Sequence, residues 1–167
     1  AGLRHLNFAP DGALWVTSAG TNQVLRFDGQ SGAYTGILAT SPDLKGPNGI
    51  SFGPDGNLYV CSVLNNRILR YNGATGAYLG AFIVSAKLQG PHDLAFGPGG
   101  RLYVTNAFAT VNKVVRFDAA SGVFVDAFVT DTALSAPLGM SFDVDGSLLV
   151  ANQGGNDVRR YDGKTGQ

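Results

Sequence analysis

The chain has 167 residues, of which 44% are hydrophobic and 14% charged, which is enough for one globular domain with its own core. Twelve basic and twelve acidic residues give a net charge of zero, so no basic field exists to attract nucleic acid or an anionic membrane. All twelve acidic residues are Asp, which removes Glu as a catalytic residue and lowers the expectation of helix. No apolar run reaches membrane-spanning length and no signal peptide is present, so no membrane partner is expected.

One sequence pattern recurs along the whole chain. It pairs a Phe and a Gly/Asp/Pro turn with a Leu-aromatic-Val strand, and its phenylalanines, Phe8, Phe52, Phe96 and Phe142, are spaced by 44, 44 and 46 residues. A period in this range indicates one supersecondary unit repeated along the chain. The first unit begins at Ala1 with a strand at 4–8, and this start inside a repeat leaves a mature product, a fragment and an engineered chain as alternatives.

The second unit shows the expected elements most clearly. Alternating or β-rich stretches predict strands at 49–52, 57–62, 67–71 and 77–84. The segments 53–56 and 72–76 are tight turns, because Pro presets φ, Asp or Asn bonds its own backbone, and Gly accepts a positive φ. Four antiparallel strands per unit, without sustained helical periodicity, predict an all-β β-propeller built from four-stranded blades.

The blades are expected at about 1–45, 46–89, 90–136 and 137–167, within a single domain. The third has a longer loop at 107–112, where the second has its loop at 63–66. The fourth ends after its third strand and the turn at 162–166, so its fourth strand is missing.

The segments GPNGISFGPDGNLYV, NNRILRYNGATGAYLG and GPHDLAFGPGGRLYV resemble NHL-type propeller repeats, in the style of secreted bacterial, streptogramin-lyase-like propellers. The resemblance covers essentially the whole chain. It implies a propeller, often of six blades, and an extracellular or periplasmic location. Members of this group include scaffolds, ligand-binding modules, and a few metal-dependent lyases and lactonases.

The resemblance also implies where a site would lie. The first strand of each blade lines a central channel, and the segment leading into it shares a rim with the loop between strands two and three. Leu138, Gly49, Gly139, Ser18, Ser62 and Asn152 hold such positions, and the polar candidates for ligand binding at the channel mouth are His92, Asp93, Asn48, Asn106, His5 and Arg4.

A His beside an Asp can bind a metal or transfer protons. In the lyase-like enzymes, however, a His pair works with a Glu and a metal, and this chain has two His and no Glu. We therefore assign no catalytic residue, no metal ligand and no cofactor, and the alternative to a catalytic or metal site is a polar channel mouth that holds water or a weak ligand.

Three repeated features have a functional and a structural interpretation. Asp11, Asp55, Asp143 and Asp145 suit calcium, but they precede strands and fit turns better. Arg26, Arg70, Arg116 and Arg160 could ring an anion, but pairing with nearby Asp or packing over aromatic rings is favoured. Trp15, Tyr59, Tyr103 and Leu149 are expected to pack between blades.

Cys61 is the single cysteine, so no intrachain disulfide can form. Thr17, Thr105 and Ala151 hold its place in the other units. A small, half-buried strand residue is the expected role of this position.

Three functions remain open, and an enzyme is the least favoured. The first is a non-catalytic scaffold or interaction module, the second a binder of a small ligand or carbohydrate at the channel mouth, and the third a metal-dependent lyase or hydrolase centred on His92. The possible partners are therefore a protein, a small molecule, or a second copy of the chain.

Self-association is expected from geometry. A propeller must close through about 360°, and blades of this type rotate by about 45–60° each, so four of them leave apolar end faces exposed. Two chains could then form a homodimeric eight-bladed ring, with blade four of one chain meeting blade one of the other. The alternatives are a piece of a longer propeller and a closed four-bladed monomer.

Overall fold

The structure is a computed structural model that describes residues 2–108 and 111–167. The all-β prediction is confirmed: the only helices among these residues are two single 3₁₀ turns, Val63–Asn65 and Gln153–Gly155. None of the described residues forms a helix long and apolar enough to cross a membrane. The chain divides into two compact units, Ala1–Val84 and Ser85–Gln167.

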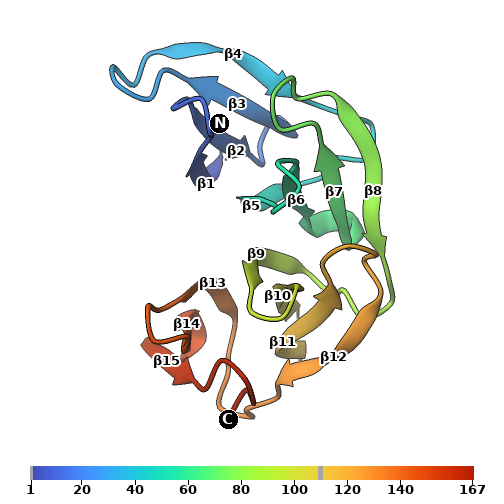
Figure 1. Ribbon diagram of the computed structural model, residues 1–167, viewed down its shortest axis with the longest axis vertical. Helices are drawn as coiled ribbons and strands as arrows, with labels where there is room; N and C mark the ends of the chain where they lie inside the picture. The colour runs from blue at the N-terminus through green and yellow to red at the C-terminus, as the bar shows by residue number, and fades with distance from the viewer. Residues whose placement is uncertain (1, 109–110) are drawn as a thin grey trace. The chain divides into compact units, whose positions relative to one another are not determined.

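The first unit contains two four-stranded antiparallel sheets, each a propeller-type blade in which the strands follow one another in chain order (Figure 1). Blade one is β1 (Leu3–Phe8), β2 (Leu14–Ser18), β3 (Gln23–Phe27) and β4 (Tyr34–Ala39), and blade two is β5 (Pro47–Phe52), β6 (Leu58–Ser62), β7 (Arg67–Tyr71) and β8 (Tyr78–Val84). The strands predicted for the second sequence repeat, 46–89, agree with β5 to β8 to within two residues.

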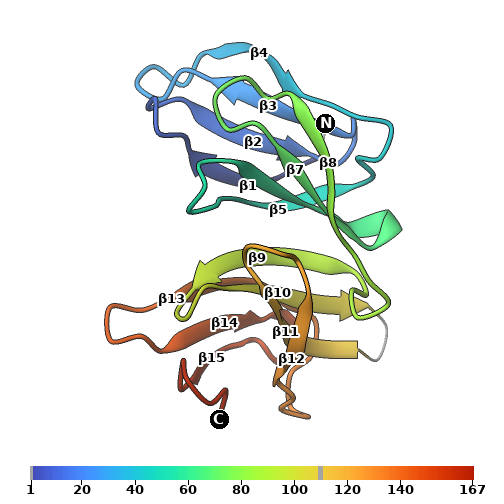
Figure 2. The ribbon, with the colours of Figure 1, turned by 45° about the vertical axis from the view of Figure 1, so that its right-hand side comes forward.

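The second unit contains blades three and four (Figure 2). Blade three is β9 (Pro91–Gly97), β10 (Arg101–Phe108), β11 (Val111–Asp118) and β12 (Phe124–Val129), and blade four is β13 (Pro137–Phe142), β14 (Leu148–Asn152) and β15 (Asp157–Tyr161). Blade four has three strands, as predicted, so β15 lies at the edge of its sheet.

The prediction of a longer loop at 107–112 is wrong at both ends of this segment, which are strand residues. Ala107 pairs with Asn112 and Phe108 with Val111, so β10 and β11 continue into an extended hairpin. Period-two alternation ends before these residues, but cross-strand hydrogen bonds prolong the ladder. Ala109 and Thr110 lie outside the described residues.

The predicted tight turns are confirmed, and each is held by a side chain. The Asn72 side-chain oxygen accepts bonds from the amides of Ala74 and Thr75 and from the Thr75 hydroxyl. Gly76 then takes a φ of 71°, a left-handed conformation that favours glycine. Asp28, Asp118 and Asp162 make the same three bonds in the other blades.

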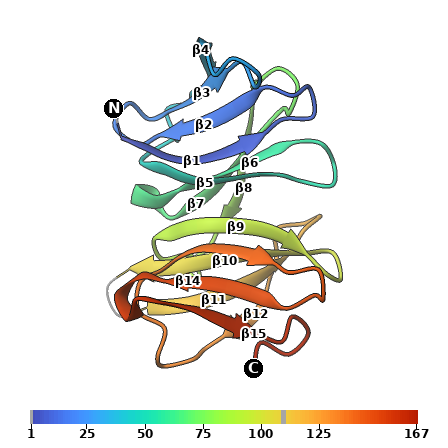
Figure 3. The same cartoon turned by 90° about the vertical axis from the view of Figure 1, so that its left-hand side faces the viewer.

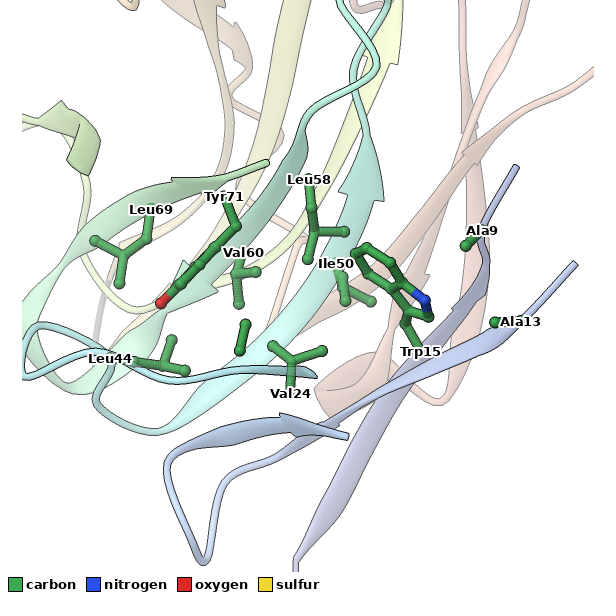
Figure 4. Packing of buried hydrophobic residues seen from close by; sticks show 11 residues of the cluster. Ala9, Ala13, Trp15, Val24, Leu44, Ile50, Leu58, Val60, Leu69 and Tyr71 are labelled. Atoms are coloured by element: carbon green, nitrogen blue, oxygen red, sulfur yellow. The ribbon is translucent and has the colours of Figure 1, made fainter. Parts of the chain in front are cut away.

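The core of the first unit lies between its two blades. Trp15 packs against Phe52 with ring centroids 4.9 Å apart. Figure 4 shows the Trp15 indole directed toward Ile50 and Leu58, and Figure 3 shows β1 and β5, the first strands of the two blades, side by side. We call the face of a blade that carries the Trp15 position its forward face, and the face that carries the Phe52 position its rear face.

The second unit repeats this interface. Tyr103, on the forward face of blade three, packs against Phe142, on the rear face of blade four, with centroids 4.9 Å apart. Val114 and Phe128 join them from blade three, and Leu148 and Val150 from blade four. The prediction that the repeated Trp/Tyr row packs between blades is confirmed for Trp15 and Tyr103.

Candidate functional site

A β-bulge marks the start of the first strand in every blade. In each blade the pairing between the first and second strands shifts register near the start of the first strand. The shift lies between Leu3 and Leu6 in blade one, and at the corresponding places between Pro47 and Ile50, Pro91 and Leu94, and Pro137 and Met140 in the other blades. The residues inside the shift are 4–5, 48–49, 92–93 and 138–139, which are the positions selected from the sequence. Bulges often lie next to functional sites because they redirect side chains.

In the first unit a threonine hydroxyl fills the bulge. Thr17 Oγ1 accepts a bond from the His5 amide at 3.0 Å and donates to the Asn48 carbonyl oxygen at 2.7 Å. Thr17 is fully buried. It therefore brings the backbones of His5 and Asn48 together and links blade one to blade two.

The second unit has the same arrangement with one addition. Thr105 Oγ1 accepts from the Asp93 amide at 2.9 Å and donates to the Leu138 carbonyl oxygen at 2.8 Å. The Asp93 carboxylate accepts a further bond from the Met140 amide at 2.9 Å. Asp93 is buried, and this bond ties it to β13, the first strand of blade four.

Asn106 supports the segment that leads into blade three. Its side-chain oxygen accepts from the Gln89 amide at 3.2 Å, and its side-chain nitrogen donates to the Lys87 carbonyl oxygen at 2.6 Å. Ser62 and Asn152 hold the corresponding segments of blades two and four. Asn106 is buried, so the contacts that the structure describes for it are structural, and its part in ligand binding stays a prediction.

Three of the six candidates belong to each of the two compact units. Arg4, which is exposed, and His5 and Asn48, which are half-buried, belong to the first unit, whereas the half-buried His92 belongs to the second with Asp93 and Asn106. The group in the first unit lies at the bulges of blades one and two, which Thr17 links, and the group in the second unit lies at the bulge of blade three beside Thr105. A single channel mouth formed by all six stays a prediction.

The turn aspartates act as expected for turns. Asp11, Asp55 and Asp145 each accept a bond from the amide two residues later, at 2.9–3.1 Å. The backbone bond from Ala13 and the Arg26 side chain hold the pKa of Asp11 below its ordinary value. Within residues 2–108 and 111–167 no three His, Cys, Asp or Glu side chains gather closely enough to hold a metal ion.

The repeated arginines have the structural contacts that we favoured, although their partners are not the aspartates two residues later. Arg26 pairs with Asp11 at 2.9 Å, and Arg160 pairs with Asp145 and Asp143. Arg116 pairs with Asp126 at 2.5 Å and lies over the Phe128 ring, and Arg70 lies over the Phe82 ring.

Two polar clusters in the segments between blades were missed by the sequence analysis. Asp43 accepts bonds from Arg67 at 2.6 Å and Tyr78 at 2.7 Å, and burial together with this carboxylate raises the pKa of Tyr78 to about 12. Asp131 accepts from Arg159 and Tyr161, both at 2.9 Å. No local pattern announces these contacts, because the partners are 24 to 35 residues apart.

The expectation for Cys61 needs correction. Cys61 is fully buried, not half-buried. Thr17 and Thr105 are equally buried, whereas Ala151 in blade four is exposed. This position of the repeat is therefore buried in blades one, two and three.

The strand order and the repeated interface define a β-propeller protein. The family comparison is more specific: the chain belongs to the virginiamycin B lyase family, which it matches over residues 1–166. The predicted resemblance to streptogramin-lyase-like propellers is thus confirmed, while the NHL-type description is only loosely related. No curated protein matches the chain significantly.

Solved structures agree on the fold. A streptogramin B lyase is 24% identical with a TM-score of 0.76, over 99% of this chain and 52% of that one. An inactive H270A virginiamycin B lyase from Staphylococcus aureus with quinupristin is 23% identical with a TM-score of 0.75, over 95% and 52%. A chain of a nidogen/laminin complex is 19% identical with a TM-score of 0.81, over 99% and 61%. The chain thus spans about half the length of the two lyases.

Proposed function

We propose that this chain is a non-catalytic propeller module whose role is interaction, and that it closes a ring as a homodimer with eight blades in total. The observation that carries the proposal is the rear face of blade one. Leu6 and Phe8 are 55% and 58% exposed, whereas Ile50, which holds the place of Leu6 in blade two, is 1% exposed. An apolar face of this kind is costly in water and marks an association surface.

The ionic contacts described above support a structural role over a chemical one. Arg26 and Arg160 pair with the turn aspartates Asp11 and Asp145, and Arg116 pairs with Asp126, so these side chains already make structural contacts. The buried polar groups near the bulges bond the backbone of the next blade in the same unit.

Light scattering on the purified chain tests the proposal. We expect the mass of two chains at micromolar concentration and a reversible shift toward one chain on dilution. A well-folded protein with the mass of one chain throughout the concentration range would contradict the dimer. That outcome would favour further blades of a longer polypeptide as the cover of the end face.

Family membership favours a second candidate, a ligand-binding or lyase activity of the streptogramin-lyase type centred on His92. The S. aureus structure holds quinupristin, and His92 lies in a bulge beside the buried Asp93. Quinupristin binding and turnover, with and without added Mg²⁺, test this candidate.

The matched variant is His92→Ala. If the bulge is a site, this variant loses quinupristin binding or turnover while its melting temperature stays nearly unchanged. A drop of several degrees without any binding in the wild type would mark His92 as structural.

A further inference from the structure

The interface between neighbouring blades is the template for a further inference, which rests on the proposed self-association. In both units an aromatic ring on a forward face packs on a phenylalanine of the next rear face, as in Trp15–Phe52 and Tyr103–Phe142. A threonine on the same forward face donates to the first strand of the next blade. Packing and hydrogen bonding thus recur at fixed positions of the repeat.

Blade one presents the receiving half of this interface. Phe8 holds the place of Phe52 and Phe142, yet it is exposed whereas they are half-buried. The same blade has an open, mostly apolar hollow of about 310 Å³, lined by Leu3, Arg4, His5, Leu6, Leu14, Val16 and Phe27. Leu6, Leu14, Val16 and Phe27 hold the positions that Ile50, Leu58, Val60 and Tyr71 fill in the core of the first unit.

Blade four presents the opposite half. Val158 is 68% exposed, whereas Val24 and Val114, which hold its place in blades one and three, are fully buried. Leu149 holds the place of Trp15 and Tyr103, and Ala151 that of Thr17 and Thr105. Because Ala151 pairs with Val158 across β14 and β15, both side chains lie on the forward face.

We propose that two copies join head to tail, with the forward face of blade four in one copy on the rear face of blade one in the other. Leu149 then packs on Phe8 as Trp15 packs on Phe52, and Val158 is covered as Val24 is. The occupant is a second copy because the two exposed faces are the two halves of an interface that this sequence already forms twice. The contact is heterologous, and two such contacts close a dimer.

One part of the template is absent from this contact. Ala151 has no hydroxyl, so the bond that Thr17 donates to the Asn48 carbonyl has no counterpart toward Arg4, which holds the place of Asn48. The junction between copies is therefore weaker than the junction within a copy. Restoring the hydroxyl should tighten it.

Charge substitutions on each face separate the possible dimers. We expect Phe8→Asp and Val158→Asp each to be monomeric by light scattering, with unchanged circular dichroism, while Leu79→Asp, at an exposed position on β8, stays dimeric. An equimolar mixture of the Phe8→Asp and Val158→Asp proteins should form a 1:1 complex, because one intact forward face and one intact rear face remain.

Each other outcome has a distinct meaning. A Val158→Asp protein that stays dimeric while Phe8→Asp dissociates indicates a symmetric contact between two blade-one faces and overturns the head-to-tail arrangement. If both variants stay dimeric, the contact lies elsewhere on the molecule, and the head-to-tail arrangement is overturned as well. A monomeric wild type contradicts the proposed homodimer itself.

A gain-of-binding pair tests the missing bond without disrupting either face. Ala151→Thr should lower the dissociation constant about three- to tenfold for each junction, the range of one net hydrogen bond. Ala151→Val has the same shape without the hydroxyl and is the control. Equal effects of Thr and Val, or weaker association of Thr than of Val, would overturn the inferred alignment of Ala151 with Arg4.

Discussion

The hydroxyl of Thr105 donates a 2.8 Å hydrogen bond to the carbonyl oxygen of Leu138, which belongs to the next blade. The hydroxyl oxygen of Thr105 also accepts a bond from the Asp93 amide, whose ladder partner is lost at the bulge. One side chain therefore satisfies the irregular backbone of its own blade and fixes the neighbouring blade. Thr17 does the same for His5 and Asn48.

Thr105→Val should lower the free energy of unfolding by about 1–3 kcal/mol, because the substitution keeps the shape and leaves buried backbone groups without their partner. Urea denaturation measures the change. Thr105→Ser keeps the hydroxyl and should lose less. Equal stability of the Val variant and the wild type would show that water or backbone relaxation replaces the two bonds.

Gly73→Ala should destabilise the turn after β7, although Gly73 has no positive φ. A Cβ there would overlap the Gly56 carbonyl oxygen, which is backbone and cannot move away cheaply. We expect a loss of about 1–3 kcal/mol, the usual cost of overpacking. Thermal unfolding measures the change.

Blade three supplies the control for this substitution. It has Ala119 at the position of Gly73, and its facing turn differs, with Gly99 and Gly100 both at positive φ. Ala119→Gly should therefore change the melting temperature little. A Gly73→Ala protein as stable as the wild type would show that the turn of blade two can adopt the blade-three geometry.

Acid should weaken the fold through Asp28 and Asp162, which hold the turns after the third strands of blades one and four. Bonds from the Ser31 amide and hydroxyl lower the pKa of Asp28, and bonds from the Thr165 and Lys164 amides lower that of Asp162. A lowered pKa in the folded state stabilises the protein above the unfolded value of about 3.9, and this contribution is lost as the pH falls through the folded value.

Asn72 makes the same bonds without titrating, so it indicates the variant to use. The double variant Asp28→Asn, Asp162→Asn should have the melting temperature of the wild type at pH 7. Between pH 5 and pH 2 its melting temperature should fall less than that of the wild type. The reverse change, Asn72→Asp, should add acid sensitivity. Parallel pH profiles of all three proteins would exclude these turns as the source.

The sequence by itself determined the elements whose causes are local. Strands such as β7 follow from β-forming residues between turn signals, and the Asn72 turn follows from a side chain that bonds its own backbone. The spacing of Phe8, Phe52, Phe96 and Phe142 determined the repeat, and the repeat placed Trp15 and Tyr103 between blades. These rules act between residues that are close in the sequence, so the sequence alone is enough to predict the elements that depend on them.

Only the tertiary structure decided what the candidate site residues do. The sequence placed Thr17 and Thr105 at a position for small residues, but their partners, Asn48 and Leu138, are 31 and 33 residues away in the next blade. The bulges at His5 and Asp93 depend on pairing with a second strand, and the role of Asn106 depends on the segment before β9. Contacts between distant segments follow from how blades pack, and no local pattern encodes which backbone group a side chain will meet there.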